Sequence, residues 1–153
     1  MTTIVICRHG HAEIGQRNSS DGDRALTLRG REEIRHAAAF LNDQDWCPTH
    51  VWSSPFVRAI QSAELLIAGL QYPGATTIVR ALTPSGSVSD VLQALAEVPA
   101  ESRILLVGHQ PLAGTLVGRL LAKPMANLPT AATVGLRLSR AEPGGGQALW
   151  AHP

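Results

Sequence analysis

The residues of this sequence best suited to chemistry are basic and imidazole side chains that lie at the ends of short apolar segments or one turn into the helix that follows. They are Arg8, His9, Arg58 and His109. Guanidinium groups and imidazoles offer N–H donors and positive charge to an anion that carries several oxygens, as a phosphoryl group does. A histidine with one unprotonated ring nitrogen can also act as a nucleophile. These four side chains therefore indicate an oxyanion site, provided that the fold brings them together.

Short β-type runs alternate with helical patterns along the chain. The predicted strands are Thr3–Cys7, His50–Ser53, Thr76–Val79, Arg103–Val107, Ala132–Leu138 and Gln147–Trp150. Apolar residues at helical spacing predict helices at Ile34–Leu41, Phe56–Leu70, Val88–Leu95 and Pro111–Leu121. This alternation predicts an α/β fold, a three-layer αβα sandwich with a mostly parallel central sheet, in one domain over residues 1–153. The last two strands, joined across Pro143–Gly146, are expected to form an antiparallel hairpin.

The predicted topology gives the candidate residues a common location. Ligands of parallel sheets bind beyond the carboxyl ends of the strands, where all four side chains stand. Ser54 is predicted as the N-cap of the second helix with Pro55 as its first residue, and Pro111 is expected to begin the helix after His109. Helix N-termini there would add N–H donors. Arg24, in the loop before the predicted N-cap Thr27, is a fifth candidate.

Several alternative chemistries lack their motifs. The chain has no GxxxxGK[ST], GxGxxG or GxSxG segment, and neither cysteine has the arginine six residues later that a cysteine phosphatase needs. Histidine remains as the candidate nucleophile. His11 shares a face with His9 in an extended backbone, but further zinc ligands at the usual spacings are missing, so no metal is expected and His11 is interpreted as a rim residue. Glu13 is interpreted as a solvated loop acid.

The charge composition and the lengths of the apolar segments limit the classes of binding partner and the location that we expect. The 153 residues carry a formal net charge of +1 with both signs spread along the chain, so neither nucleic acid nor a membrane surface is an expected partner. The apolar stretches are too short for a secretory segment or a membrane span, and the cysteines form no CxxC pair. These features predict a cytoplasmic location.

Arg8-His9-Gly10 at the end of the first strand resembles the signature of the histidine phosphatase superfamily, whose fold is phosphoglycerate-mutase-like. The similarity continues in order through RALTLRG, SSPFVRAIQSAE, LTPSGSVSDV, VGHQPLAG and PTAAT, over nearly the whole chain. The segment order and the short length resemble the small SixA-type phosphohistidine phosphatases more than the larger mutases. Ser62 stands where the family often has threonine.

The resemblance implies a role for each candidate residue. His9 would accept the phosphoryl group, while Arg8, Arg58, His109 and Arg24 would bind its oxygens, without a metal or other cofactor. To attack, His9 must be neutral, so one ring nitrogen should donate to an acceptor such as a backbone carbonyl. His109 should donate to phosphate in either its neutral or its protonated form. Water would then hydrolyse phospho-His9.

Larger relatives place a glutamate general acid after the third strand, where this chain has Arg80-Ala81-Leu82-Thr83-Pro84. The labile P–N bond of phosphohistidine needs no such acid once the imidazole is protonated, so the expected substrate is phosphohistidine in a partner protein, such as a signalling phosphotransfer domain. Two alternatives stay open. One is a phosphomonoesterase for small phosphorylated molecules, with Glu13 as the acid, and the other is a phosphate-binding or phosphoprotein-binding module without turnover.

Overall fold

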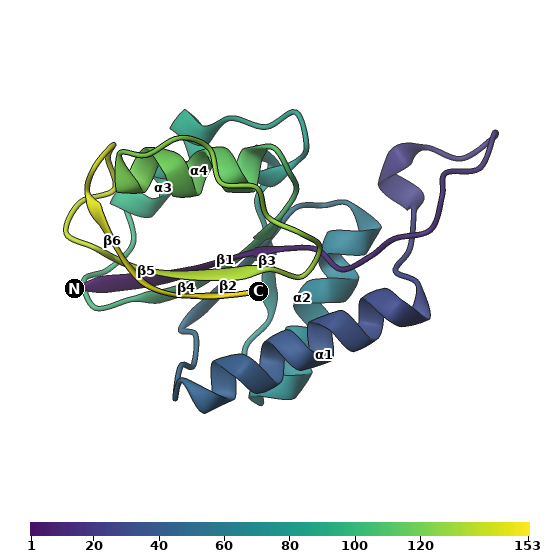
Figure 1. Ribbon diagram of the computed structural model, residues 1–153, viewed down its shortest axis with the longest axis horizontal. Helices are drawn as coiled ribbons and strands as arrows, with labels where there is room; N and C mark the ends of the chain where they lie inside the picture. Colours follow the sequence, from purple (N-terminus) through teal and green to yellow (C-terminus); the bar gives the residue numbers. More distant parts are fainter.

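The computed structural model describes residues 1–153 and has a six-stranded sheet between two layers of helices (Figure 1). The strands are β1 Thr2–Arg8, β2 His50–Ser53, β3 Thr76–Ile78, β4 Arg103–Gly108, β5 Thr133–Leu138 and β6 Gly146–His152. The α-helices are α1 Leu28–Asp43, α2 Val57–Leu70, α3 Val88–Ala96 and α4 Leu112–Leu121, and two short 3-10 turns are η1 Asp21–Asp23 and η2 Arg80–Leu82. The predicted αβα sandwich is confirmed.

The strand order is β3-β2-β4-β1-β5-β6. Strands β1 to β4 pair only in parallel with one another, and β5 and β6 form the predicted antiparallel hairpin. In addition, β5 pairs antiparallel with β1, which was not predicted. The carboxyl ends of β1, β2 and β4 therefore lie side by side. This edge of the sheet is where the candidate residues follow their strands.

The apolar run of β1 is buried because its side chains pack alternately into the hydrophobic cores on the two faces of the sheet. Ile4 and Ile6 belong to the core beneath α3 and α4, whereas Val5 and Cys7 belong to the core beneath α1 and α2. Successive side chains of a strand point to opposite faces, so a central strand covered on both sides has no polar positions. The side chains of β1 are therefore buried on both faces of the sheet from Ile4 up to Cys7, the residue before Arg8.

The start of α1 is packed against the loop that follows β1. Thr27 caps the helix as predicted, because its Oγ1 accepts the N–H of Gly30 at 3.0 Å. A Cβ on Gly30 would overlap the carbonyl of His11, and a Cβ on Gly10 would lie 2.6 Å from the carbonyl oxygen of Gly30. The two glycines therefore allow the close approach of α1 to the loop at His9.

Two predicted helix starts are wrong in detail. The N-cap of α2 is Phe56, so Ser54 is not the cap and Pro55 is not helical. The reason is that the N–H of Ser54 still bonds to the carbonyl of Val107 at 3.1 Å, which keeps Ser54 extended beside β4. Pro111 is the N-cap of α4, so the helix begins one residue later than predicted, at Leu112.

One strand also differs from its predicted bounds. The strand predicted to end at Val79 ends one residue earlier, at Ile78.

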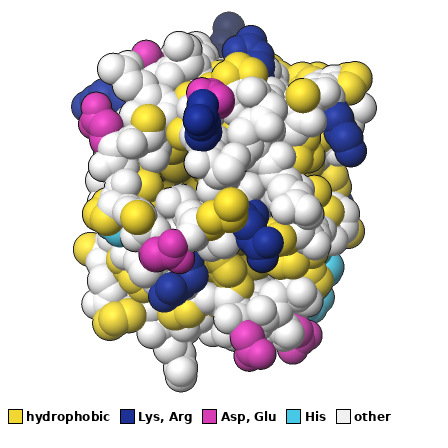
Figure 2. Space-filling view, turned by 90° about the vertical axis from the view of Figure 1, so that its left-hand side faces the viewer, with side chains coloured by type: hydrophobic (Ala, Val, Ile, Leu, Met, Phe, Trp, Pro, Cys, Tyr) yellow, Lys and Arg dark blue, Asp and Glu magenta, His cyan; other side chains and the backbone are white.

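The face at the amino ends of the parallel strands, opposite the candidate site, is shown in Figure 2. Lysine and arginine side chains lie singly among aspartates and glutamates there, with small apolar areas between them. This face has no continuous basic stripe. None of the helices combines the length and the apolar character that a membrane span requires.

Candidate active site

The predicted site residues meet at one cavity of about 280 Å³. It is lined by Arg8, His9, His11, Ala12, Arg24, Arg58, Pro84, His109, Gln110 and Thr130. All five residues predicted from the sequence are among them. Three larger cavities, of about 330, 340 and 400 Å³, lie elsewhere on the molecule. The smallest of these three is lined by two histidines, His36 and His152, but none of the three contains a cluster of arginines. The chemistry of its lining, rather than its size, distinguishes the cavity at the carboxyl ends of the strands.

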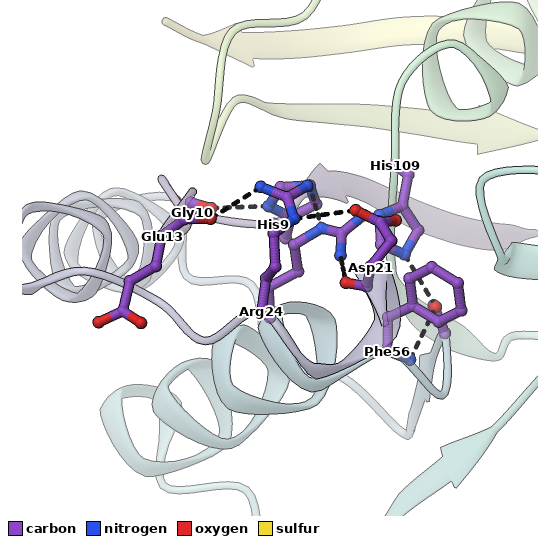
Figure 3. A network of polar contacts seen from close by, with 9 residues as sticks. His9, Gly10, Glu13, Asp21, Arg24, Phe56 and His109 are labelled. Atoms are coloured by element: carbon purple, nitrogen blue, oxygen red, sulfur yellow. Dashed lines mark hydrogen bonds and ion pairs between the residues drawn. The ribbon is translucent and has the colours of Figure 1, made fainter. Parts of the chain in front are cut away.

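His9 directly follows β1 and is 6% exposed. Its Nδ1 lies 2.6 Å from the carbonyl oxygen of Gly10, the type of backbone acceptor expected from the sequence (Figure 3). Because Nδ1 donates its proton there, the lone pair of the neutral ring is on Nε2. The Nε–H of Arg58 points to this lone pair at 3.3 Å. The imidazole is thus oriented through one nitrogen and nucleophilic at the other.

Arg58 lies in the first turn of α2 and is 3% exposed. Its Nη1 donates to the carbonyl of Asp21 at 2.8 Å and its Nη2 to the Asp21 carboxylate at 3.0 Å. The same carboxylate accepts Nε–H of Arg24 at 2.8 Å (Figure 3). Burial raises the pKa of Asp21, but the hydrogen bonds and charges of the two arginines outweigh this and lower it overall. An ionised carboxylate therefore joins Arg24 to Arg58.

His109 follows β4 and is 1% exposed. Its Nε2 lies 2.8 Å from the hydroxyl of Ser54, while its Nδ1 is buried without a hydrogen-bond partner. Arg8 donates from Nη1 to the carbonyl of Leu128 at 2.9 Å, and its Nε is also buried without a partner. Unpaired buried polar atoms are rare in folded proteins. Two of the three such atoms belong to residues that line this cavity, and the third is Nδ1 of His152. Both Arg8 and His109 thus retain a donor position that a ligand with acceptor oxygens would satisfy.

Both histidines have lowered pKa values. Burial lowers the pKa of His9 to about 4, and the charges of Arg58 and Arg8 act in the same direction, outweighing the carbonyl of Gly10. Burial also lowers the pKa of His109 to about 3, together with His9 and Arg58. Of the two forms that the sequence allowed for His109, the neutral one is therefore favoured in the free protein at neutral pH.

We expect both imidazoles to remain neutral well below pH 6.5, the ordinary histidine value. Because the unfolded chain binds these protons first, the free energy of unfolding should fall as the pH drops from 6.5 toward 4. A ¹⁵N NMR titration of the histidine rings measures the pKa values directly. Midpoints near 6.5 for both His9 and His109 would contradict the burial that the structure gives them.

Other residues of the site could not be singled out from the sequence. Ser62 Oγ accepts the N–H of Gly10 at 3.0 Å and donates to the carbonyl of Arg58 at 2.7 Å, so serine retains a hydroxyl where the family often has threonine. Glu33 accepts the N–H of His11 at 2.8 Å and the hydroxyl of Thr130 at 3.0 Å. The only available signal was their position inside quoted segments or next to them. Except for the bond from Ser62 to Arg58, four residues earlier, these contacts join distant parts of the chain.

The two residues treated as peripheral lie at the rim. His11 lines the cavity, with Nδ1 2.8 Å from the hydroxyl of Thr27. The carboxylate of Glu13 points away from His9 and His109 (Figure 3), and only its backbone carbonyl takes part, accepting from Arg24 at 2.9 Å. No group of three or more His, Cys, Asp or Glu side chains is arranged to hold a metal ion.

The chain matches the family model of the histidine phosphatase superfamily (branch 1) over residues 4–81. It is 38% identical over 120 residues to phosphohistidine phosphatase SixA of Escherichia coli (strain K12), covering 76% of this chain and 73% of SixA. The chain belongs to the histidine phosphatase superfamily. The resemblance inferred from Arg8-His9-Gly10 and the segments after it is thereby confirmed.

Two further comparisons place the chain within the histidine phosphatase superfamily. The structure of the protein histidine phosphatase SixA complexed with tungstate superposes with a TM-score of 0.87 at 32% identity, covering 97% of this chain and 95% of that one. A 6-phosphofructo-2-kinase/fructose-2,6-bisphosphatase of Rattus norvegicus is 42% identical over 64 residues, which are 42% of this chain. The match spans only 14% of the length of that relative. The SixA structure therefore matches over nearly its full length. This agrees with the resemblance to the small SixA-type members that the segment order and the short length indicated.

Proposed function

We propose that the protein is a phosphatase that takes the phosphoryl group from phosphohistidine in a partner protein and releases it to water through phospho-His9. The observation that carries this proposal is the state of His9: a buried neutral imidazole, tied at Nδ1 to Gly10, beside the guanidinium groups of Arg8, Arg24 and Arg58. A neutral nucleophile inside a ring of cationic donors is what phosphoryl transfer requires.

The first step of the proposed reaction transfers the phosphoryl group. The lone pair of His9 Nε2 attacks phosphorus, the P–N bond of the substrate breaks, and its electron pair stays with the leaving imidazole, which has already taken a proton. Charge on the three phosphoryl oxygens is met by the arginines and by His109. In the second step a water molecule attacks phospho-His9, which restores neutral His9 and forms inorganic phosphate.

The lack of a carboxylic acid that could act as a proton donor in the cavity supports phosphohistidine as the substrate over a phosphate monoester. The ten residues that line the cavity include no aspartate or glutamate, and Pro84 belongs to the segment where larger relatives carry a glutamate. Asp21 is held ionised by Arg24 and Arg58, and the Glu13 carboxylate points elsewhere. A monoester must expel an alkoxide, which needs a proton donor, whereas a protonated imidazole leaves without one. The similarity to SixA, itself named a phosphohistidine phosphatase, supports the same substrate class.

Comparative turnover tests the proposal. A phosphotransfer domain phosphorylated on histidine, a sugar phosphate and p-nitrophenyl phosphate are offered to the same preparation. We expect kcat/KM for the phosphohistidine protein to exceed that for both monoesters by more than about a hundredfold, or ~2.7 kcal/mol of activation free energy.

Two results would replace the proposal by its alternatives. Equal or faster turnover of the monoesters would identify a small-molecule phosphomonoesterase. Binding of inorganic phosphate without turnover of any substrate, and without acid-labile label on His9, would identify a phosphate-binding module.

A further inference from the structure

Ser54 and His109 are brought together by the register of two neighbouring strands. Ser53, the last residue of β2, pairs with Val107 of β4, so Ser54 and His109 both lie just beyond the paired ends. Ser54 has no exposed surface and His109 is 1% exposed. The hydroxyl oxygen of Ser54 lies 2.8 Å from Nε2 of His109. The contact is therefore buried and fixed by the sheet.

The hydrogen atoms at this contact can be assigned from its surroundings. Ser54 Oγ accepts the backbone N–H of Phe56 at 3.1 Å, and its only other polar neighbour is Nε2 of His109. The adjacent hydroxyl of Ser53 is directed to the carbonyl of Ser54. If Nε2 carried the imidazole proton, the hydroxyl proton of Ser54 would be buried without an acceptor, which is costly. Donation from Ser54 to Nε2 avoids that cost.

We propose that Ser54 is a positioning residue of the phosphate site: its hydroxyl donates to Nε2 of His109 and so keeps the single proton of that imidazole on Nδ1. There the N–H donates to a phosphoryl oxygen. Nδ1 is the atom of His109 that is buried without a partner, on a residue that lines the cavity with His9 and Arg58. The inference rests on the proposed function for the nature of the ligand.

The orientation of the ring supports this assignment. The imidazole of His109 packs edge-on against Phe56, with ring centroids 5.2 Å apart, and lies 4.9 Å from the ring of His9. These contacts fix the plane of the ring (Figure 3). The position of the imidazole proton therefore decides whether Nδ1 of His109 presents an N–H donor or a lone pair to a bound anion. With the proton on Nδ1, a neutral His109 is a donor to an anion. With the proton on Nε2, it would present a lone pair that repels phosphoryl oxygens.

Two-bond ¹H–¹⁵N NMR spectra of the free protein at pH 7 identify the protonated nitrogen of His109 without any substrate. The variants are Ser54→Ala, Ser54→Thr as the rescue that keeps a hydroxyl, and Ser53→Ala as the matched control, which removes an equally buried hydroxyl from the next residue. The affinity of each variant for inorganic phosphate is measured by isothermal titration, with folding checked by circular dichroism.

We expect wild type, Ser54→Thr and Ser53→Ala to carry the proton on Nδ1. Ser54→Ala should show the other tautomer or a mixture of both, with a Kd for phosphate raised by about tenfold or more, the usual weight of a hydrogen bond to a charged group. Protonation of wild-type His109 on Nε2 would overturn the proposal. This measurement uses only the wild-type protein, so it remains a valid test even if Ser54→Ala does not fold. A folded Ser54→Ala with unchanged tautomer and phosphate affinity would overturn the proposal as well. Absence of phosphatase activity would refute the proposed function. The NMR measurement would still decide whether Ser54 keeps the proton of His109 on Nδ1.

Discussion

Replacement of His9 by alanine is expected to abolish turnover, lowering kcat for the phosphohistidine substrate by more than about 10⁴-fold, as loss of a covalent nucleophile does in other enzymes. The affinity for inorganic phosphate should change by less than about tenfold, because the arginines and His109, which we propose bind the oxygens, remain. Steady-state kinetics and phosphate titration measure the two quantities on the same sample.

The His9 prediction has a direct chemical readout. Mixing wild type with a phosphodonor and quenching in alkali should trap an acid-labile phosphoryl label, which peptide mapping assigns to His9; the alanine variant should acquire none. His36→Ala is the matched control, because His36 is exposed on α1, away from the cavity lining. An alanine variant at position 9 with wild-type turnover would rule out His9 as the nucleophile.

Arg58→Ala is expected to lose about 2–4 kcal/mol of transition-state stabilisation, roughly a 30-fold to 1000-fold fall in kcat/KM. The structure gives the reason, since the guanidinium is buried, is held by Asp21, and directs Nε–H to His9 Nε2 at 3.3 Å. A phosphoryl group bound to that nitrogen brings its oxygens within reach of the same donor. Arg58→Lys should recover only part of the loss, because an ammonium group lacks the planar fork.

The control for Arg58 is Arg35→Ala. Arg35 is exposed on α1 and pairs with Glu32 three residues earlier, so its removal should leave kcat/KM within about twofold. Thermal unfolding of both variants separates a loss of structure from a loss of catalysis. A folded Arg58→Ala enzyme that loses less than tenfold in kcat/KM would mean that Arg58 does not contact the phosphoryl group.

Local patterns account for what could be predicted of the fold. The apolar run Ile4–Cys7 is nearly free of polar residues because a central strand is covered on both faces, and helical spacing from Ile34 to Leu41 marks the buried side of α1. Thr27 caps α1 because a hydroxyl can reach an N–H three residues later. Each of these features depends on residues close in sequence, so periodicity and residue type were sufficient.

Arg8, His9, Arg58 and His109 could be selected from the sequence by residue type, by their place after predicted strands and by the segments shared with a family. The sequence alone determined the alternation of elements and these chemistry-bearing positions, because both are recorded in local spacing. The tertiary structure alone decided the partners: Asp21 between Arg24 and Arg58, Ser54 on His109 rather than at the helix N-cap, and the lowered pKa values of both histidines. Asp21 and Arg24 are only three residues apart, but the contacts of Arg58 with Asp21 and of Ser54 with His109 join segments far apart in the chain. These contacts and the burial of the histidines depend on strand register and packing, which no local pattern contains.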